Sequence, residues 1–317
     1  MRITNNMLSS NLLQNLEAAQ GRIDDLQNQL STGHRINKPS DDPAGVQNAM
    51  RLKSNIASVT QWSNNADQAL QFMNATDSTM GDMTSMLQRI RDLAVQGSNG
   101  TLATTDRGAI ADEVDQLSFQ LQMMANTQVG SKYMFSGSAT DKKLIPTNST
   151  GSIDLSALSG SQANGLDINF EVGNNLNIPV SVNGQTLFGL TTTTDPSTHI
   201  TTTTTTATGM LNTLSTLSSD LRSNDSTGVS NLLGNLDVNI NNVINQRADL
   251  GARINRMTAI QSQLGSTSNN LQGNLSSIQD ADMAKTITDF TNQQNVYKAA
   301  LAVGAKIIQP SLVDFMN

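Results

Sequence analysis

The residues of this sequence that could do acid–base chemistry gather in one short stretch, STGHRINKPSDDPAG, at positions 31–45. Asp41 and Asp42 are adjacent carboxylates, and a pair of carboxylates can act as general acid and base. No companion histidine, lysine or glycine-rich loop accompanies them in a pattern that fits catalysis. Asp42 directly precedes Pro43, and this order is typical of a helix N-cap followed by the first helical turn. We therefore expect a cap here, and no catalytic residues.

The two histidines give equally little support to a metal site. His34 and His199 each stand alone, with no histidine, cysteine or acidic partner at the spacing of metal ligands, so we expect both to be solvated. The chain has no cysteine, which excludes disulfides, thiol nucleophiles and zinc–thiolate sites. P-loop, GxGxxG and GxSxG motifs are also missing. The sequence thus predicts no enzyme, no cofactor and no metal.

Composition narrows the function classes further. The net charge of −7 argues against a nucleic-acid partner, because such proteins need a basic stripe to displace phosphate counterions. Aromatic residues make up only 3% of the 317 residues, and the apolar positions are mostly aliphatic, which suits helix seams better than a ligand pocket. We expect neither a cleaved signal peptide nor a membrane partner, because no apolar run has the required length.

Apolar residues spaced three and four apart predict long helices in the first part of the chain. The first seam runs over Leu12, Leu16, Ala19, Ile23, Leu26 and Leu30. A second seam lies within 43–96, a helix of roughly 80 Å at the usual rise per residue. A third stretch of the same kind covers 110–124, and a shorter one covers 210–221.

The 3.5-residue period is most sustained late in the chain. Between Val229 and Ile278 the apolar positions alternate steps of four and three, interrupted by Arg247, Gln261 and Ser268. This period is the signature of a coiled coil. The polar interruptions either fix the register or are tolerated near water. Residues 279–282 break the register, and a last amphipathic segment begins at Met283.

The middle of the chain, residues 131–206, loses the helical period. SIDLSAL, LDINFEV and NIPVSVNGQTLFGL alternate as strands do, and Asn183-Gly184 predicts a two-residue hairpin. The threonine runs near 191–206 fit exposed strands or a loose linker.

These patterns predict a mainly α fold with a β insertion: a long antiparallel coiled-coil rod plus a small β-rich outer domain. We assign 1–40 and 280–317 to a terminal coiled-coil inner domain. The rod comprises 41–130 and 207–279, and 131–206 forms the β-rich domain.

The terminal amphipathic segments raise the main functional question, namely whether their apolar faces pack within one chain or between neighbouring chains. Neither has the Lys/Arg-rich polar face of a membrane-surface helix. If they pair with each other and with neighbouring copies, the protein is a polymer subunit. We name eleven residues as the assembly stripe: Leu12, Leu16, Ile23, Leu26, Leu30, Ile287, Phe290, Tyr297, Leu301, Ile308 and Phe315.

Several motifs resemble the bacterial flagellin family. They are LSTGHRINKPSDDPAG at 30–45, RIRDLAVQGSNGTL at 89–102, QRADLGARINRM at 246–257, IQDADMAKTITDF, and VYKAALAVGAKIIQPSLVDFMN at the end. They occur in the family's order and cover about 1–135 and 229–317. The opening MRITNNMLSSNLL, the two prolines of NKPSDDP and the turn GSKYMFSGSATDKK at 130–143 are more similar to the family's hook–filament junction subunits than to its filament subunits.

The resemblance implies an extracellular subunit of the flagellum, secreted through the flagellar export apparatus with the help of an export chaperone. Terminal helices would line an axial tube, and the β domain would point outward. A layer of copies would join the hook, through hook-associated protein 1, to the flagellin of the filament. The filament subunit itself is the near alternative, and a trimeric coiled-coil fibre is a more distant one.

Overall fold

The computed structural model describes residues 5–145, 167–194, 201–206 and 208–308. The chain divides into two compact units: Met1–Thr60 with Ser266–Asn317, and Gln61–Gly265. We call the first the terminal unit and the second the central unit. The predicted division into three domains stays a prediction. The predicted fold class, a mainly helical rod with a small β-containing region, is confirmed.

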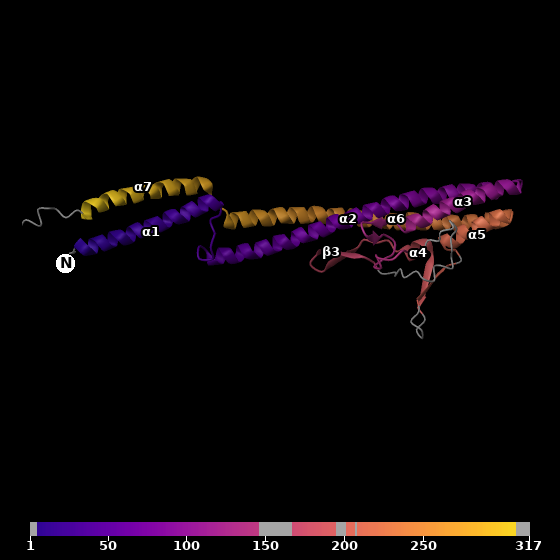
Figure 1. Cartoon of the computed structure of the whole chain (residues 1–317), viewed down its shortest axis with the longest axis horizontal. Helices are drawn as coiled ribbons and strands as arrows, with labels where there is room; N and C mark the ends of the chain where they lie inside the picture. The colour runs from indigo at the N-terminus through magenta and orange to yellow at the C-terminus, as the bar shows by residue number, and fades with distance from the viewer. Residues whose placement is uncertain (1–4, 146–166, 195–200, 207, 309–317) are drawn as a thin grey trace, which may run out of the picture. The chain divides into compact units, whose positions relative to one another are not determined.

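The terminal unit is helical throughout its described part. It holds α1 (Asn5–Thr32), the start of α2 (Pro43–Gly97), the end of α6 (Ser226–Gln279) and α7 (Met283–Ile308). Helices α1 and α7 lie side by side, in indigo and yellow in Figure 1, although their sequences are far apart.

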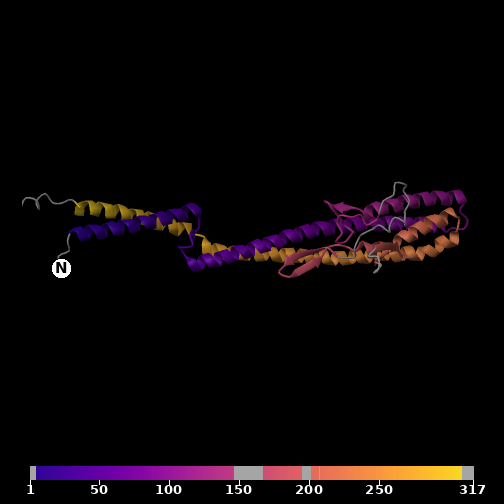
Figure 2. The same cartoon turned by 60° about the horizontal axis from the view of Figure 1, so that its bottom comes forward.

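The central unit contains the rest of α2 and α6 together with α3 (Thr104–Ala125) and α5 (Met210–Arg222). Helices α3 and α5 pack against each other, and the view of Figure 2 shows both running along the long helices. The core is aliphatic and methionine-rich. At seven-residue steps α2 contributes Ala66, Met73, Met80, Leu87 and Ala94, all fully buried. Leu236, Val243, Leu250, Met257 and Leu264 repeat the same step on α6 and are also buried. The predicted heptad is therefore confirmed.

Two of the polar residues that interrupt the α6 heptad have partners on α2. The guanidinium of Arg247 donates to both carboxylate oxygens of Asp77, at 2.7 and 3.2 Å. Gln261 donates to the Asp67 carboxylate. Gly81 lies one turn beyond Asp77, and the guanidinium of Arg247 lies against it at van der Waals distance. These pairs favour the interpretation that the polar residues fix the register of α6 against α2. A shift of one heptad would separate the partners of both pairs.

The β structure of the described residues consists of three antiparallel hairpins. They pair β1 (Gln128–Val129) with β2 (Lys132–Tyr133), β3 (Asn169–Gly173) with β4 (Leu176–Pro179), and β5 (Leu190–Thr194) with β6 (Thr201–Thr205). The threonine runs thus form the β5–β6 hairpin, as one of the two predicted alternatives. The predicted strand SIDLSAL lies outside the described residues.

The prediction of a hairpin at Asn183-Gly184 is wrong. Asn183 is the N-cap of a short helix, α4 (Gly184–Phe188), and its side chain accepts a hydrogen bond from the backbone N–H of Gln185 at 2.9 Å. Gly184 is needed for space, since an added Cβ would lie 2.3 Å from the backbone oxygen of Phe135. Asparagine favours both caps and turns, so the local signal could not separate them.

One buried cation closes the central unit where α2 and α5 end. Arg107 of α3 is 2% exposed, and its guanidinium donates to the backbone oxygens of Gly97 at 3.0 Å, Asn99 at 2.6 Å and Asn224 at 3.3 Å. It also donates to the side-chain oxygen of Asn224. Carbonyl groups at helix C-termini carry partial negative charge, so they compensate a cation that has no carboxylate beside it.

Replacing Arg107 by leucine should destabilise the central unit by about 2–4 kcal/mol, because one buried and two partly buried hydrogen bonds to carbonyl groups are lost. Chemical denaturation of the full-length protein measures this. Arg89→Leu is the matched control: Arg89 forms an exposed ion pair with Glu113 at 2.7 Å and should cost at most about 1 kcal/mol. Equal losses in the two variants would contradict the assigned role of Arg107.

Candidate assembly site

The candidate assembly site is built on the pair of terminal helices, α1 and α7. The predicted stripe on α1 faces α7, because Leu12, Leu16, Ile23, Leu26 and Leu30 are all half-buried. On α7, Phe290 and Tyr297 are half-buried as well. Gly304 fixes the contact at one end: a Cβ there would lie 2.8 Å from the side chain of Leu12. The seam is thus shared within one chain.

Burial between these two helices is incomplete. Among the described apolar side chains of α1, only that of Ala19 is buried, with 4% of its surface exposed. The central unit, in contrast, buries many large side chains completely. Two helices alone can cover only one side of each other, so this pair excludes water poorly.

A second set of apolar side chains on the same helices faces solvent, and we call it the exposed row. Its exposed fractions run from 43% to 59%. The row consists of Met7, Leu13, Met283, Ile287, Val296, Leu301 and Val303. Ile287 and Leu301 were predicted for the stripe and lie in this row. Ile308 belongs to α7 but its side chain is not described, and Phe315 lies outside the described residues. The assembly role of the eleven residues stays a prediction.

Residues 33–42, which we call the spoke, connect α1 to α2. Gly33 ends α1 with φ of +74°, the left-handed conformation expected there. Asp42 caps α2 as predicted, accepting a hydrogen bond from the Gly45 N–H at 2.9 Å. The carboxylate of Asp41 accepts from the N–H groups of Lys38 and Asn37, and these bonds hold the pKa of Asp41 below its usual value. Asp41 therefore stabilises the turn within the spoke, and Asp42 caps α2.

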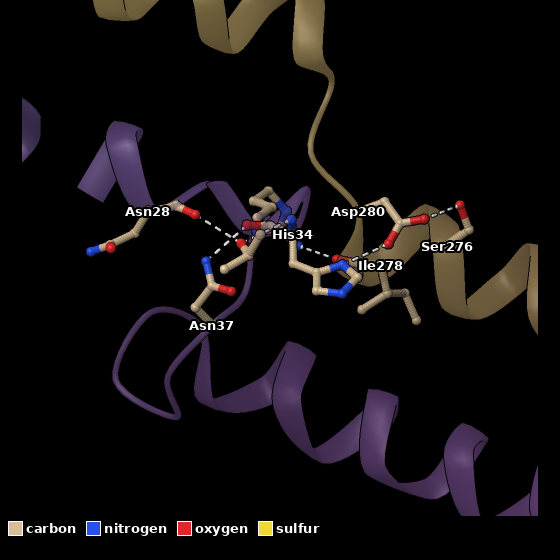
Figure 3. Close-up of polar contacts among 8 residues, drawn as sticks. Asn28, His34, Asn37, Ser276, Ile278 and Asp280 are labelled. Atoms are coloured by element: carbon tan, nitrogen blue, oxygen red, sulfur yellow. Dashed lines mark hydrogen bonds and ion pairs between the residues drawn. The ribbon is translucent and has the colours of Figure 1, made fainter. Parts of the chain in front are cut away.

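The spoke is hydrogen bonded to the break between α6 and α7, and we call this contact the clasp (Figure 3). The N–H of Arg35 donates to the Gln279 oxygen at 2.7 Å, and the N–H of Ala281 donates to the Gly33 oxygen at 2.9 Å. The Arg35 guanidinium also donates to the carbonyl of Ile278 at 2.8 Å. The joint predicted at 279–282 is confirmed, and Asp282 caps α7 there by accepting from the Lys285 N–H.

The prediction that His34 is a lone, solvated residue is wrong. Its Nδ1 lies 2.9 Å from a carboxylate oxygen of Asp280, and both side chains are a little under half exposed. Figure 3 shows the ring pointing toward that carboxylate, which Ser276 approaches from the other side. The Ser276 hydroxyl donates at 2.6 Å and, with His34, holds the pKa of Asp280 below its usual value. His199 lies outside the described residues.

The described residues bring together no group of three or more metal-ligating side chains. No helix in the described part of the chain is long and apolar enough to cross a bilayer.

Paired terminal helices, a heptad-packed helical core and a small β region are typical of a helical structural subunit. Two family models match this chain: the bacterial flagellin N-terminal helical region over residues 3–140, and the bacterial flagellin C-terminal helical region over 233–316. The chain belongs to the flagellin family. It is a structural subunit of the bacterial flagellum, from a family of structural, non-enzymatic proteins whose members form that extracellular organelle.

Similar curated proteins are flagellins. Flagellin A of Vibrio cholerae is 26% identical, with 93% of each chain covered. A flagellin of Clostridium tyrobutyricum is 28% identical, over 98% of this chain and 99% of the relative. Flagellin FlaB1 of Treponema pallidum is 28% identical, over 87% of this chain and 85% of the relative.

Solved structures with the same fold carry a different name. A structure described as a flagellar hook-associated protein of Vibrio parahaemolyticus has a TM-score of 0.63 and 17% identity, covering 76% of this chain and all of that one. FlgL of Bacillus cereus has a TM-score of 0.56 and 18% identity, over 71% and 99%. At this identity the likeness concerns the fold alone.

The pH dependence of the clasp follows from Asp280. A carboxyl whose pKa is lowered on folding stabilises the protein above its ordinary pKa of 3.8, and this contribution is lost as the pH falls through the lowered value. Asp280→Asn should therefore lower the stability of the terminal helices at about pH 7, and the loss should shrink as the pH falls through the lowered pKa of Asp280. Because the pair is nearly half exposed, the effect is below about 1 kcal/mol. Hydrogen exchange of the α7 amides measures it, and a loss that is independent of pH would contradict it.

Proposed function

We propose that this chain is the hook–filament junction subunit, hook-associated protein 3. In this role a layer of copies joins hook-associated protein 1 on the hook to flagellin on the filament. The filament subunit itself is the second candidate, because the curated relatives are named flagellins. Secretion through the flagellar export apparatus, with a chaperone covering the C-terminal stripe, belongs to the same proposal.

The observation that carries the assembly part of this proposal is the exposed row on a pair of helices that bury little. Each large aliphatic side chain transferred from water to an interface contributes about 1.5–3 kcal/mol before the cost of ordering is subtracted. Seven such side chains on the terminal helices favour burial against other copies. The eleven-residue stripe and the inner, rod and outer domains follow as parts of this proposal.

The junction role is supported by the resemblance of the turn GSKYMFSG to that of junction subunits, and this turn has a defined geometry. Gly130 and Gly137 both have φ of +63°, a conformation that other residues rarely adopt. Between them, Met134 and Phe135 are 1% exposed, and the Phe135 ring packs edge-on against Phe188 with 6.1 Å between centroids. The motif that resembles junction subunits is thus built into the core of the central unit.

Removing the terminal segments separates assembly from folding. A chain lacking 1–40 and 280–317 should remain folded, because the core of the central unit lies within 61–265. It should no longer assemble, since it lacks the whole stripe and the whole exposed row. Thermal unfolding and sedimentation measure the two properties, with the full-length protein as control. If the truncated chain unfolds, the termini belong to the intramolecular core, and the hypothesis that they serve assembly between copies is weakened.

A deletion strain decides between junction and filament subunit. If the chain is the junction subunit, cells lacking it should carry hooks without filaments and release unassembled flagellin into the medium. If it is the filament subunit, no flagellin monomer should leak. Immuno-electron microscopy of isolated flagella gives the second readout: label at a single band above the hook is expected, and label along the whole filament would overturn the junction role.

A further inference from the structure

A small cleft lies beside the spoke, at the start of α2. Its volume is about 230 Å³, and its floor is apolar: Ile36 and Ala49 are 6% and 7% exposed, and Val46 is half-buried. Met50 stands at its edge with 67% of its surface exposed, the largest exposed fraction of any large apolar side chain in the described residues. An apolar floor next to an exposed methionine favours an apolar occupant.

The rim of this cleft is basic. Lys38 and Lys53 both line it and both are exposed. Neither forms an ion pair within 4 Å among the described residues, although Lys38 also attracts the nearby carboxylate of Asp41. The natural occupant is therefore an apolar side chain that has carboxylates close to it on the same surface.

One exposed face of α1 has this chemistry. Leu13 is 53% exposed, and Glu17 and Asp24 follow it at steps of four and seven residues. On a helix these three side chains lie within about 40° of one another. The two carboxylates also lack ion-pair partners among the described residues. Two helical turns, about 10 Å, separate Glu17 from Asp24, so both can meet the flexible lysines of one rim.

The α1 face cannot reach the cleft of its own chain. Leu13 lies nineteen residues before the end of α1 at Thr32, which is about 28 Å of helix, and the cleft lies beyond that end. An intramolecular contact would require α1 to leave α7. The complementary face must therefore be supplied by another molecule.

We propose that the cleft at the spoke receives the Leu13–Glu17–Asp24 face of α1 from a second copy of this chain. The contact uses two different surfaces, so it is heterologous and can repeat from copy to copy around a layer or along a helix. This inference rests on the proposed function, in that it requires copies of the chain to assemble. It adds the direction of one contact and the residues that hold it.

Disulfide trapping tests the contact, because the natural chain has no cysteine. The full-length double variant Leu13→Cys/Met50→Cys replaces the wild-type protein in motile cells, and isolated flagella are oxidised and run on a denaturing gel without reductant. We expect a ladder of dimers and larger multimers, since a disulfide forms only when the two Cα atoms approach within about 7 Å. Each single variant should remain monomeric.

The control pairs Leu13→Cys with Val238→Cys, which is 61% exposed on α6 in the central unit. It should give no ladder. If the double variant also gives none, or if Met50→Cys alone gives dimers, the proposed contact is overturned. Where the double variant fails to enter flagella, the two single variants are co-expressed in motile cells and the isolated flagella are oxidised: a mixed dimer supports the contact, and its absence overturns it.

Charge reversal supplies an independent readout. Lys38→Glu/Lys53→Glu should remove the cross-link, and adding Glu17→Lys/Asp24→Lys to the same chain should restore it. Reversing Lys132 and Lys142, which are exposed on the central unit, should leave the ladder unchanged. A ladder on flagella labelled along the whole filament would keep the contact and overturn the junction role. A single labelled band without a ladder would support the junction role and overturn the contact.

Discussion

The clasp between the spoke and the α6–α7 break is the contact on which the terminal unit depends. A pair of helices packed along a heptad seam can be interrupted only where both helices break at the same level, because a break in one alone leaves the other without a partner. Gly33 and Gln279 are more than two hundred residues apart, yet their backbones are joined through 33–36 and 279–281. Each new helix then starts with an aspartate cap, Asp42 for α2 and Asp282 for α7. The two restarts therefore use the same local chemistry.

The sequence predicted those parts of the fold that depend on neighbouring residues. The heptads of α2 and α6, the left-handed Gly33, the Asp42 cap and the joint at 279–282 were all predicted correctly, since each is determined within one or two helical turns. His34 was misread because its partner, Asp280, is 246 positions away. Arg107 gave no signal at all: an arginine on a helix is normally exposed, and its partners here are backbone carbonyl groups from two other segments. Asn183-Gly184 failed for another reason, because a cap and a turn use the same residue types.

Polar residues in the heptad of α6 show how a single register of α6 against α2 is selected. A seam of leucine, methionine and alanine repeats itself every seven residues, so shifting α6 against α2 by one heptad would bury almost the same side chains. Arg247 with Asp77 and Gln261 with Asp67 remove this degeneracy, because a shifted register leaves charges without partners. The energy of each partly exposed pair is small, and its effect is to discriminate between registers.

The terminal and central units divide stability and assembly between them. The central unit buries whole methionine, leucine and phenylalanine side chains and can be stable within one chain. The terminal helices bury their apolar side chains only in part, and in the function that we propose contacts with other copies contribute to their free energy of folding. By mass action, such helices become more ordered as neighbouring copies become available. In the function that we propose, the ordering of the termini is therefore coupled to the growth of the structure they belong to.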